Sequence, residues 1–213
     1  MRHWILGLAV LPLCIAAETG FAPLFDGATL NGWEVRPRES ASGRWEVAGS
    51  ELTVRGRPGN LATTSEYGDF DLRLEWRIGP LGNSGVFYRV SQDGNPAATA
   101  VECQIADPAR QASMENADRR PGAAYGLYAP TADASRPPGE WNALRIVVQG
   151  TRAEHWLNGR KVVEFDFASE EFARRAQASN RKEGFGRALK GRIELQDHNS
   201  AVWFRNIRIR RLD

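Results

Sequence analysis

The stretch VECQIAD, residues 101–107, carries acidic and amide side chains within an apolar segment. Glu102 and Gln104 alternate with three apolar residues, which is the period of a half-buried β-strand. The two polar side chains therefore project to one side of the strand and the apolar residues to the other. A carboxyl group placed this way can transfer a proton to or from a bound substrate. Glu102 is the candidate catalytic acid or base, although a solvated strand residue would give the same alternation.

Asp107 closes the run, and strict alternation points it to the opposite side from Glu102. We expect a β-bulge near Ile105 and Ala106 to bring it back. The spacing E-x-Q-x-x-D is similar to the E-x-D-x-x-E signature of jelly-roll glycosidases, except that Gln104 replaces the middle acid. Retaining hydrolysis needs two carboxyl groups about 5–5.5 Å apart, whereas five extended residues separate their Cα atoms by about 13 Å or more. A two-carboxylate mechanism is disfavoured unless Glu75 or Asp197 supplies the second acid.

Further polar and aromatic residues gather in a few other stretches. GNSGVFYR places Asn83 and Arg89 at a turn and in the strand after it, and LQDH puts Gln196 and His198 on one side of a strand. This range of donors and acceptors suits sugar hydroxyls. Aromatic residues in or beside loops are candidates for stacking on a sugar ring, namely Tyr125, Tyr128 and Trp141.

Alternation of period two runs through the chain, and helical periodicity is scarce. Strands are predicted over residues 69–78, 84–90, 101–107, 141–150, 152–157, 161–167, 191–198 and 201–209. Asn158-Gly159 predicts a tight hairpin, and one short helix is predicted over residues 169–179, capped by Ser169. Short antiparallel strands joined by turns favour an all-β fold, a jelly-roll β-sandwich of two antiparallel sheets with one short helix.

The first 17 residues have the layout of a signal peptide, with a charged start, an apolar run from Trp4 to Ile15 and the small residues Ala16 and Ala17. The run is about 12 residues long, short of the roughly 20 that a membrane-spanning helix needs. We therefore expect a periplasmic or secreted protein with a single domain over residues 21–213. Cys14 leaves lipidation open as a less favoured alternative. Cleavage after Ala16 or Ala17 leaves Cys103 as the one cysteine, so no internal disulfide is expected.

Charge and motif content exclude several classes of partner and cofactor. The net charge is +2, from 28 basic and 26 acidic residues spread along the chain, which gives no strong field for nucleic acid or an anionic membrane. The basic run RNIRIRRL alternates with apolar residues and is interpreted as a strand with a solvated face. Beyond the predicted leader only His155 and His198 remain, which excludes a three-histidine zinc site but leaves a mixed carboxylate and histidine site open.

Taken together, these stretches resemble the 3-keto-disaccharide hydrolase domain family, and the resemblance covers nearly all of residues 21–213. The motifs NSGV-x-x-R, E-x-Q-I-x-D and LQDH…FRNI are specific in combination, although each is weak alone. They appear with PLFDGATLNGWEV, YGDFDLRLEWRI and GEWNALRIVVQGTRAEHWLNGRKV in the family's order. The resemblance implies a concanavalin A-like sandwich with a groove on its concave sheet.

The resemblance also implies cleavage of glycosides already oxidised to a ketone at sugar C3. The ketone acidifies the C2 hydrogen, so a base removes that proton, the glycosidic oxygen leaves by β-elimination, and water adds back. This route needs one base and one acid, with donors for the enolate oxygen.

Glu102 is predicted as base or acid with His198 as its partner. The predicted substrate contacts are Asn83, Arg89, Gln104, Asp107, Tyr125, Trp141 and Gln196. Asp107 has three open roles: binding substrate, orienting another side chain or ligating a metal. No cofactor is required by this chemistry, and a divalent metal stays open.

The expected partner is a carbohydrate substrate, a 3-keto-glycoside, with no nucleic acid and no membrane span. The oligomeric state, the aglycone and the linkage are not set by the sequence. Two alternatives remain: a noncatalytic carbohydrate-binding module, and a conventional glucanase-like glycoside hydrolase.

Overall fold

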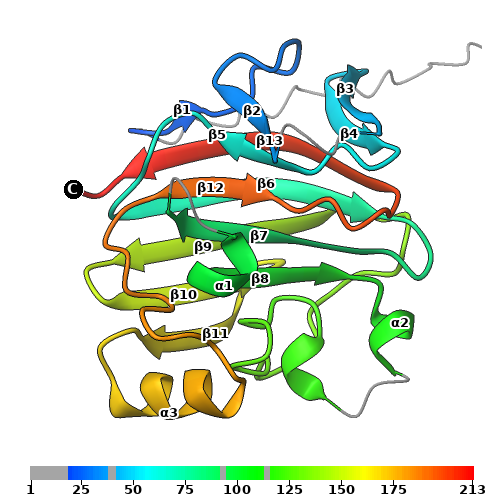
Figure 1. Cartoon of the computed structure of the whole chain (residues 1–213). Coiled ribbons are helices and arrows are strands. Elements are labelled where there is room, and N and C mark those ends of the chain that lie inside the picture. The colour runs from blue at the N-terminus through cyan, green and yellow to red at the C-terminus, as the bar shows by residue number, and fades with distance from the viewer. Residues whose placement is uncertain (1–18, 38–41, 92–94, 113–115) are drawn as a thin grey trace, which may run out of the picture.

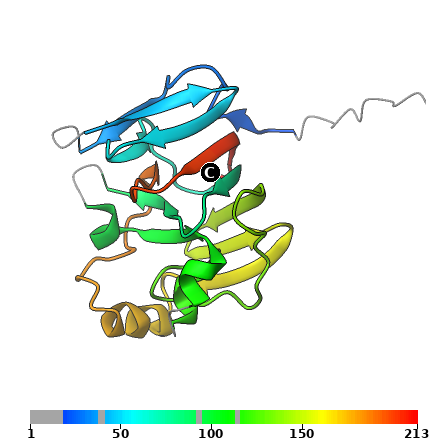
Figure 2. The same cartoon turned by 90° about the vertical axis from the view of Figure 1, so that its right-hand side faces the viewer.

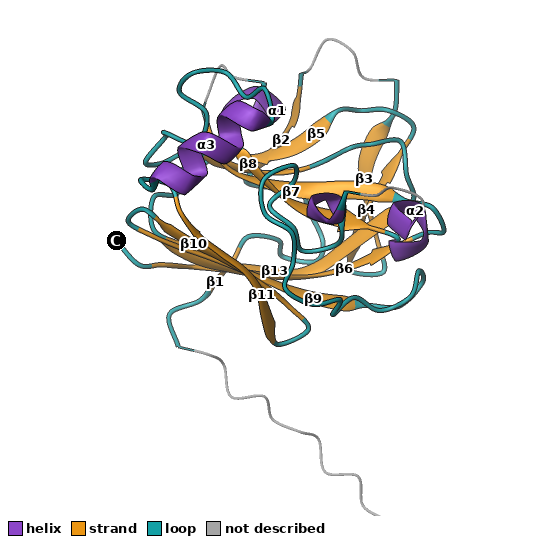
Figure 3. Ribbon diagram, turned by 90° about the horizontal axis from the view of Figure 1, so that it is seen from below, coloured by secondary structure: helices purple, strands orange, loops and turns teal. Residues whose placement is uncertain are grey.

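The computed structural model describes residues 19–37, 42–91, 95–112 and 116–213. The predicted signal peptide, residues 1–17 with Cys14, lies outside the described residues. Two antiparallel sheets of eight and five strands pack face to face, which confirms the predicted all-β sandwich. Figure 3 shows the sheets as two layers, and Figures 1 and 2 place the β3–β4 hairpin at one end of the molecule and α3 at the other.

The larger sheet has the strand order β11-β10-β9-β6-β13-β4-β3, with β1 paired to β13. Its central strands alternate strictly, as the sequence predicts, so one face of each is apolar. Its strands are β1 (Ala22–Pro23), β3 (Arg44–Ala48), β4 (Glu51–Arg55), β6 (Phe70–Ile78), β9 (Asn142–Gln149), β10 (Arg152–Leu157), β11 (Arg160–Asp166) and β13 (Val202–Arg211). The predicted hairpin joins β10 and β11, where Asn158 and Gly159 both have positive φ, 49° and 82°.

The smaller sheet has the order β2-β5-β12-β7-β8, so β8 lies at one edge of it. Its strands are β2 (Trp33–Arg36), β5 (Asn60–Thr63), β7 (Asn83–Val90), β8 (Val101–Ala106) and β12 (Arg192–Leu195). Strands far apart in sequence become neighbours here, since β12 lies between β5 and β7. This sheet carries VECQIAD as β8.

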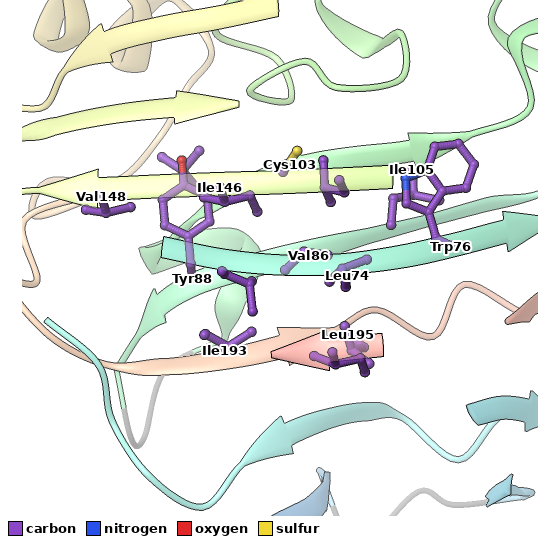
Figure 4. Close-up of a cluster of buried hydrophobic side chains, with 14 of the residues drawn as sticks. Leu74, Trp76, Val86, Tyr88, Cys103, Ile105, Ile146, Val148, Ile193 and Leu195 are labelled. Carbon is purple, nitrogen blue, oxygen red and sulfur yellow. The ribbon is translucent and has the colours of Figure 1, made fainter. Parts of the chain in front are cut away.

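The core fills the space between the two sheets. Figure 4 shows apolar side chains from both sheets in this core, including Cys103 and Ile105 of β8 and Ile146 of β9. Tyr88 donates or accepts a hydrogen bond with fully buried His155, whose other ring nitrogen lies 2.9 Å from the carbonyl of Gly122. His155 and Cys103 are thus core residues, as the alternation predicts for Cys103.

The helices are short and connect strands. The predicted helix is confirmed as α3 (Glu170–Ala178), with Ser169 capping its first turn through a hydrogen bond from the Phe172 amide. The prediction of one helix is too low, because the described residues also contain α1 (Pro96–Thr99), α2 (Pro108–Ala112) and a 3₁₀ turn at Ala117–Arg119. These three lie in the long loops on either side of β8. α1 lies on the outer side of the five-stranded sheet (Figure 3).

The predicted β-bulge before Asp107 is wrong. β8 pairs with β7 in unbroken register from Val101 opposite Tyr88 to Ala106 opposite Asn83. Asp107 therefore lies past the end of the strand, where α2 begins. Among the described residues, no helix has both the length and the apolar character needed to cross a membrane.

Candidate active site

Glu102 lies on the outer face of the five-stranded sheet. Its neighbours Val101, Cys103 and Ile105 belong to the core cluster, so alternation turns Glu102 away from the core. The residue is nevertheless only 8 % exposed, and no described residue makes a hydrogen bond to its carboxyl group. Burial raises the pKa of Glu102 to about 8, against a smaller opposing effect from the charge of Arg181. A carboxyl group with this pKa exchanges a proton near neutral pH, as an acid–base catalyst must.

The space for the Glu102 side chain comes from Gly85 on the neighbouring strand β7. A Cβ atom at Gly85 would lie 2.7 Å from Glu102 Cγ, closer than atoms can pack. Only glycine at this position lets the carboxyl group lie across the face of β7. The glycine of the NSGV motif therefore shapes the site.

Two residues from elsewhere in the chain border Glu102. The Tyr125 amide donates to the Glu102 carbonyl, 3.0 Å, so this loop segment runs along the free edge of β8 and brings Tyr125 next to Glu102. Arg181, in the loop after α3, donates to the carbonyls of Ala97 and Tyr125. Arg181 thereby joins α1 to this loop and brings a positive charge toward Glu102.

Amide side chains extend the site along the same outer face. Gln104 donates to Asn83 Oδ1, 3.0 Å, and the Gln196 amide donates to the Gly85 carbonyl, 2.9 Å. Neither Gln104 Oε1 nor Gln196 Oε1 has a hydrogen-bond partner among the described residues, and both atoms are buried. Buried acceptors without partners are costly in a folded protein and suit donors brought by a ligand. Asn83, Gln104 and Gln196, all predicted from sequence, thus lie together.

Glu194 of β12 belongs to this outer face and is the residue that sequence reasoning missed. It is 1 % exposed, accepts a hydrogen bond from Asn60 Nδ2 at 3.1 Å, and lines a pocket of about 420 Å³ together with Arg36 and Asn95. Burial raises its pKa. The available signal was alternation in GRIELQDH, which puts Glu194 on the side of Gln196 and His198. Glu102 does not line this pocket.

His198, the predicted partner of Glu102, is exposed in the loop after β12. It lines a shallow pocket of about 290 Å³ with Arg57, Asp197 and Asn199, and no described contact joins it to Glu102. Asp197 accepts hydrogen bonds from the amides of Gly59 and Asn199, so it shapes this loop rather than reaching Glu102.

Arg89 and Asp107 are buried in contacts with the protein itself. Arg89 binds the carbonyls of Gly68 and Gly150 and forms an ion pair with Asp69 at 2.9 Å. Both carboxylate oxygens of Asp107 accept backbone amides, from Leu81 at 2.7 Å and Ala109 at 2.9 Å. These contacts fix a loop and the start of α2. Substrate contact by Arg89 or Asp107 stays a prediction.

The aromatic candidate Trp141 lies on the other side of the molecule. Its ring stacks against Arg77 and Arg205, which belong to the eight-stranded sheet. Glu75, considered as a second acid, also lies on that sheet and accepts hydrogen bonds from Arg205 and Asn206.

Tyr128, another aromatic candidate, stacks on Phe165 and lies beneath Arg175. Of the three aromatic candidates, the structure brings Tyr125 to Glu102.

A metal site is not evident in the described part of the chain, where no three His, Cys, Asp or Glu side chains gather in an arrangement that would hold an ion. The positive charges near the two site carboxyls come from arginines, Arg181 for Glu102 and Arg36 and Arg192 for Glu194.

The fold and the polar outer face define a concanavalin A-like β-sandwich with a candidate active site on its smaller sheet. The same fold is found in the carbohydrate-binding module CBM66 of Bacillus subtilis, with a TM-score of 0.53 at 14 % identity over 84 % of this chain and 95 % of that one. The model of the 3-keto-α-glucoside-1,2-lyase-like domain matches residues 20–210, so the chain belongs to that family. The resemblance found from sequence is confirmed.

Two relatives show how far the similarity extends. The chain is 28 % identical over 230 residues to a 3-keto-disaccharide hydrolase of Bacteroides thetaiotaomicron, covering 91 % of this chain and 79 % of that protein. A crystal structure of a Parabacteroides distasonis protein, named only provisionally as a glycosyl hydrolase, superposes with a TM-score of 0.81. That protein is 30 % identical, with 91 % of this chain and 94 % of the other covered. The family implies a carbohydrate substrate.

Proposed function

We propose that this protein cleaves the glycosidic bond of 3-keto-glycosides on the outer face of its five-stranded sheet. A base removes the C2 proton beside the C3 ketone, the electron pair forms the C1–C2 double bond, and the glycosidic oxygen leaves with a proton. Water then adds across the double bond, so the net reaction is hydrolysis. Glu102 is one of the two proton-transfer groups.

The observation that carries this proposal is the state of Glu102. It is a buried carboxyl group with no hydrogen-bond partner among the described residues and with its pKa raised by burial to about 8. A structural carboxylate at such a position is normally paired. A group that exchanges protons near neutral pH suits removal of a ketone-acidified hydrogen or protonation of a leaving oxygen.

The neighbouring side chains suit a hydroxylated ligand. Gln104, Gln196 and Asn83 offer amide donors and acceptors beside Glu102, and Tyr125 offers an aromatic ring. We assign these four to substrate binding. His198 remains a candidate proton-transfer partner, in which case the loop after β12 must bring it closer to Glu102. The predicted leader supports a periplasmic or secreted location.

The test is to incubate the purified protein with 3-keto-trehalose, a 3-keto-glucoside and the two unoxidised sugars. We expect cleavage of the keto sugars alone, followed by NMR or by chromatography of the released sugar. Cleavage of the unoxidised sugars alone would point to a conventional glycosidase. Saturable sugar binding without product would point to a noncatalytic carbohydrate-binding module, and either outcome contradicts the proposal.

A further inference from the structure

Glu102 shares a cross-strand row with a second buried carboxyl group. Phe87 of β7 lies opposite Glu102 of β8 on one side and opposite Glu194 of β12 on the other. Residues paired in this way project to the same face of a sheet. The Cα atoms of Glu102 and Glu194 are thus two strand spacings apart, about 9.5 Å. Phe87 itself is buried, but the Glu102 carboxyl group lies over Gly85 on β7, the strand between β8 and β12. From there both carboxyl groups can reach a sugar bound beside Gln104 and Gln196.

The two carboxyl groups differ in their surroundings. Glu102 has no hydrogen bond from a described residue and faces the charge of Arg181. Glu194 accepts a hydrogen bond from Asn60, and Arg36 Nη1 lies 3.8 Å from its Oε1. Both residues are buried, which raises the pKa of each.

Charged and polar neighbours stabilise the charged form of Glu194 more than that of Glu102. Asn60, Arg36 and Arg192 stabilise the charged form of Glu194, against an opposing effect from Glu34. Glu102, with a pKa of about 8, is therefore the acid of the pair, while Glu194 has more neighbours that stabilise its charged form.

Glu194 also borders a pocket. It lines the pocket of about 420 Å³ formed with Arg36, Asn60 and Asn95. Its Oε1 makes no hydrogen bond to any described residue, although the side chain is almost fully buried. A buried carboxyl oxygen that accepts no hydrogen bond and borders a pocket is unusual in a purely structural ion pair.

We propose that Glu194 is the second catalytic carboxyl group of this site, acting as the base, while Glu102 acts as the acid. This assignment rests on the proposed function and makes Glu194, rather than His198, the partner of Glu102. The Glu194 carboxylate takes the C2 proton, and the C2–H electron pair forms the C1–C2 double bond. The C1–O bond breaks, and its electron pair takes the proton of Glu102.

Hydration reverses these transfers and resets the site. The Glu102 carboxylate removes a proton from the water that attacks C1, and Glu194 returns its proton to C2. The products are the 3-keto sugar and the free aglycone alcohol, and both carboxyl groups regain their starting state. No further oxidant, reductant or co-reactant is needed.

The test separates the two roles by leaving group and by hydrogen exchange. The wild type, Glu102→Gln and Glu194→Gln are compared on 4-nitrophenyl and methyl 3-keto-α-glucoside, with C2 exchange in D₂O followed by NMR. Glu194→Gln should lose at least about 10²-fold in kcat on both substrates and stop C2 exchange. Glu102→Gln should lose at least about 10²-fold on the methyl glycoside and less than about 10-fold on the nitrophenyl glycoside, whose oxygen leaves without a proton. C2 exchange should continue in that variant.

Controls distinguish the failure of this assignment from the failure of the proposed function. Glu75→Gln, a hydrogen-bonded carboxyl on the other sheet, should keep wild-type rates, and thermal unfolding checks that each variant is folded. If Glu194→Gln is unfolded, Glu194→Asp replaces it, with a loss expected in kcat rather than in KM. Wild-type rates in the Glu194 variant, or loss of C2 exchange in His198→Gln instead, overturn the assignment while keto-sugar cleavage stands. Absence of cleavage by the wild type contradicts the proposed function itself.

Discussion

The outer faces of the two sheets each bury a carboxyl group near the start of a strand, yet the surroundings of the two groups are opposite in kind. On the eight-stranded sheet, Asp71 of β6 is bound by the guanidinium groups of Arg73, Arg145 and Arg210 at 3.0–3.2 Å. Burial of Asp71 opposes its ionisation, but the hydrogen bonds of Arg145 and Arg73 outweigh burial and lower its pKa. On the five-stranded sheet, Glu102 has no such partner, and burial raises its pKa.

This difference distinguishes a structural carboxylate, Asp71, from a candidate catalytic carboxyl group, Glu102. Asp71 is a permanent anion that joins three strands, β6, β9 and β13, and its arginines are held in turn over aromatic rings such as Phe21 and Trp156. Glu102 contributes no cross-strand hydrogen bond and costs the fold stability when it is charged. A group retained at such a cost points to function.

The largest expected effects come from replacing each carboxylate by its amide. Glu102→Gln should lower kcat on a 3-keto-glycoside with a poor leaving group by about 10³-fold while leaving the protein folded. Asp71→Asn should keep kcat within a few-fold of wild type and lose about 2–3 kcal/mol of unfolding free energy, because three guanidinium groups lose their anion. Steady-state kinetics measures kcat, and urea unfolding measures the free energy of unfolding. Equal losses of unfolding free energy in both variants would contradict the assignment of a structural role to Asp71 and a functional role to Glu102.

The pH dependence of stability should also differ between the faces. The pKa of Glu102 is about 8 in the folded protein and near 4.5 in the unfolded chain, so between these pH values the folded state holds a proton that the unfolded state has released. Its contribution is full below about pH 4.5 and is lost as the pH rises through 8, by a few kcal/mol.

The comparison is made by denaturant unfolding at pH 5 and pH 9. Between pH 5 and pH 9, Glu102→Gln should lose less free energy of unfolding than the wild type does. Glu75→Gln serves as the matched control and should follow the wild-type curve. An unchanged loss in Glu102→Gln contradicts the raised pKa of this group.

Gly85→Ala should cost about 1–3 kcal/mol of stability, because the new methyl group meets the Glu102 side chain. The same change made in a Glu102→Ala background should cost clearly less, since the side chain in its way is gone. A double-mutant cycle on unfolding free energies measures this coupling. A cost that is the same in both backgrounds would place the clash elsewhere.

The smallest expected effect is that of Arg181→Gln. Loss of this positive charge should raise the pKa of Glu102 further. The part of the pH profile of kcat/KM that reports the titration of Glu102 should then move to higher pH, by less than about one unit. Arg187→Gln, in the same loop and exposed, is the matched control and should leave the profile in place. A shift to lower pH in the Arg181 variant would contradict the stabilisation of charged Glu102 by Arg181.

The strands and much of the site could be predicted because alternation is a local property. It predicted the outward direction of Glu102 and Gln104 and the core positions of Cys103 and Ile105. A different local signal, a Ser169 cap followed by two acidic residues, predicted the helix. The bulge before Asp107 was predicted to serve an expected carboxylate pair. In the structure, Asp107 instead caps the start of α2.

By itself, the sequence determined the β-sandwich class, the family and the faces of each strand, since periodicity and motif order are read along one chain. Only the tertiary structure decided which polar faces meet. The insertion of β12 between β5 and β7 put Glu194 in one row with Glu102, and the same packing placed Trp141 and Glu75 on the opposite sheet. Strand order, burial and the absence of a counter-charge are properties of the assembled sheets, and these set the pKa of a carboxyl group.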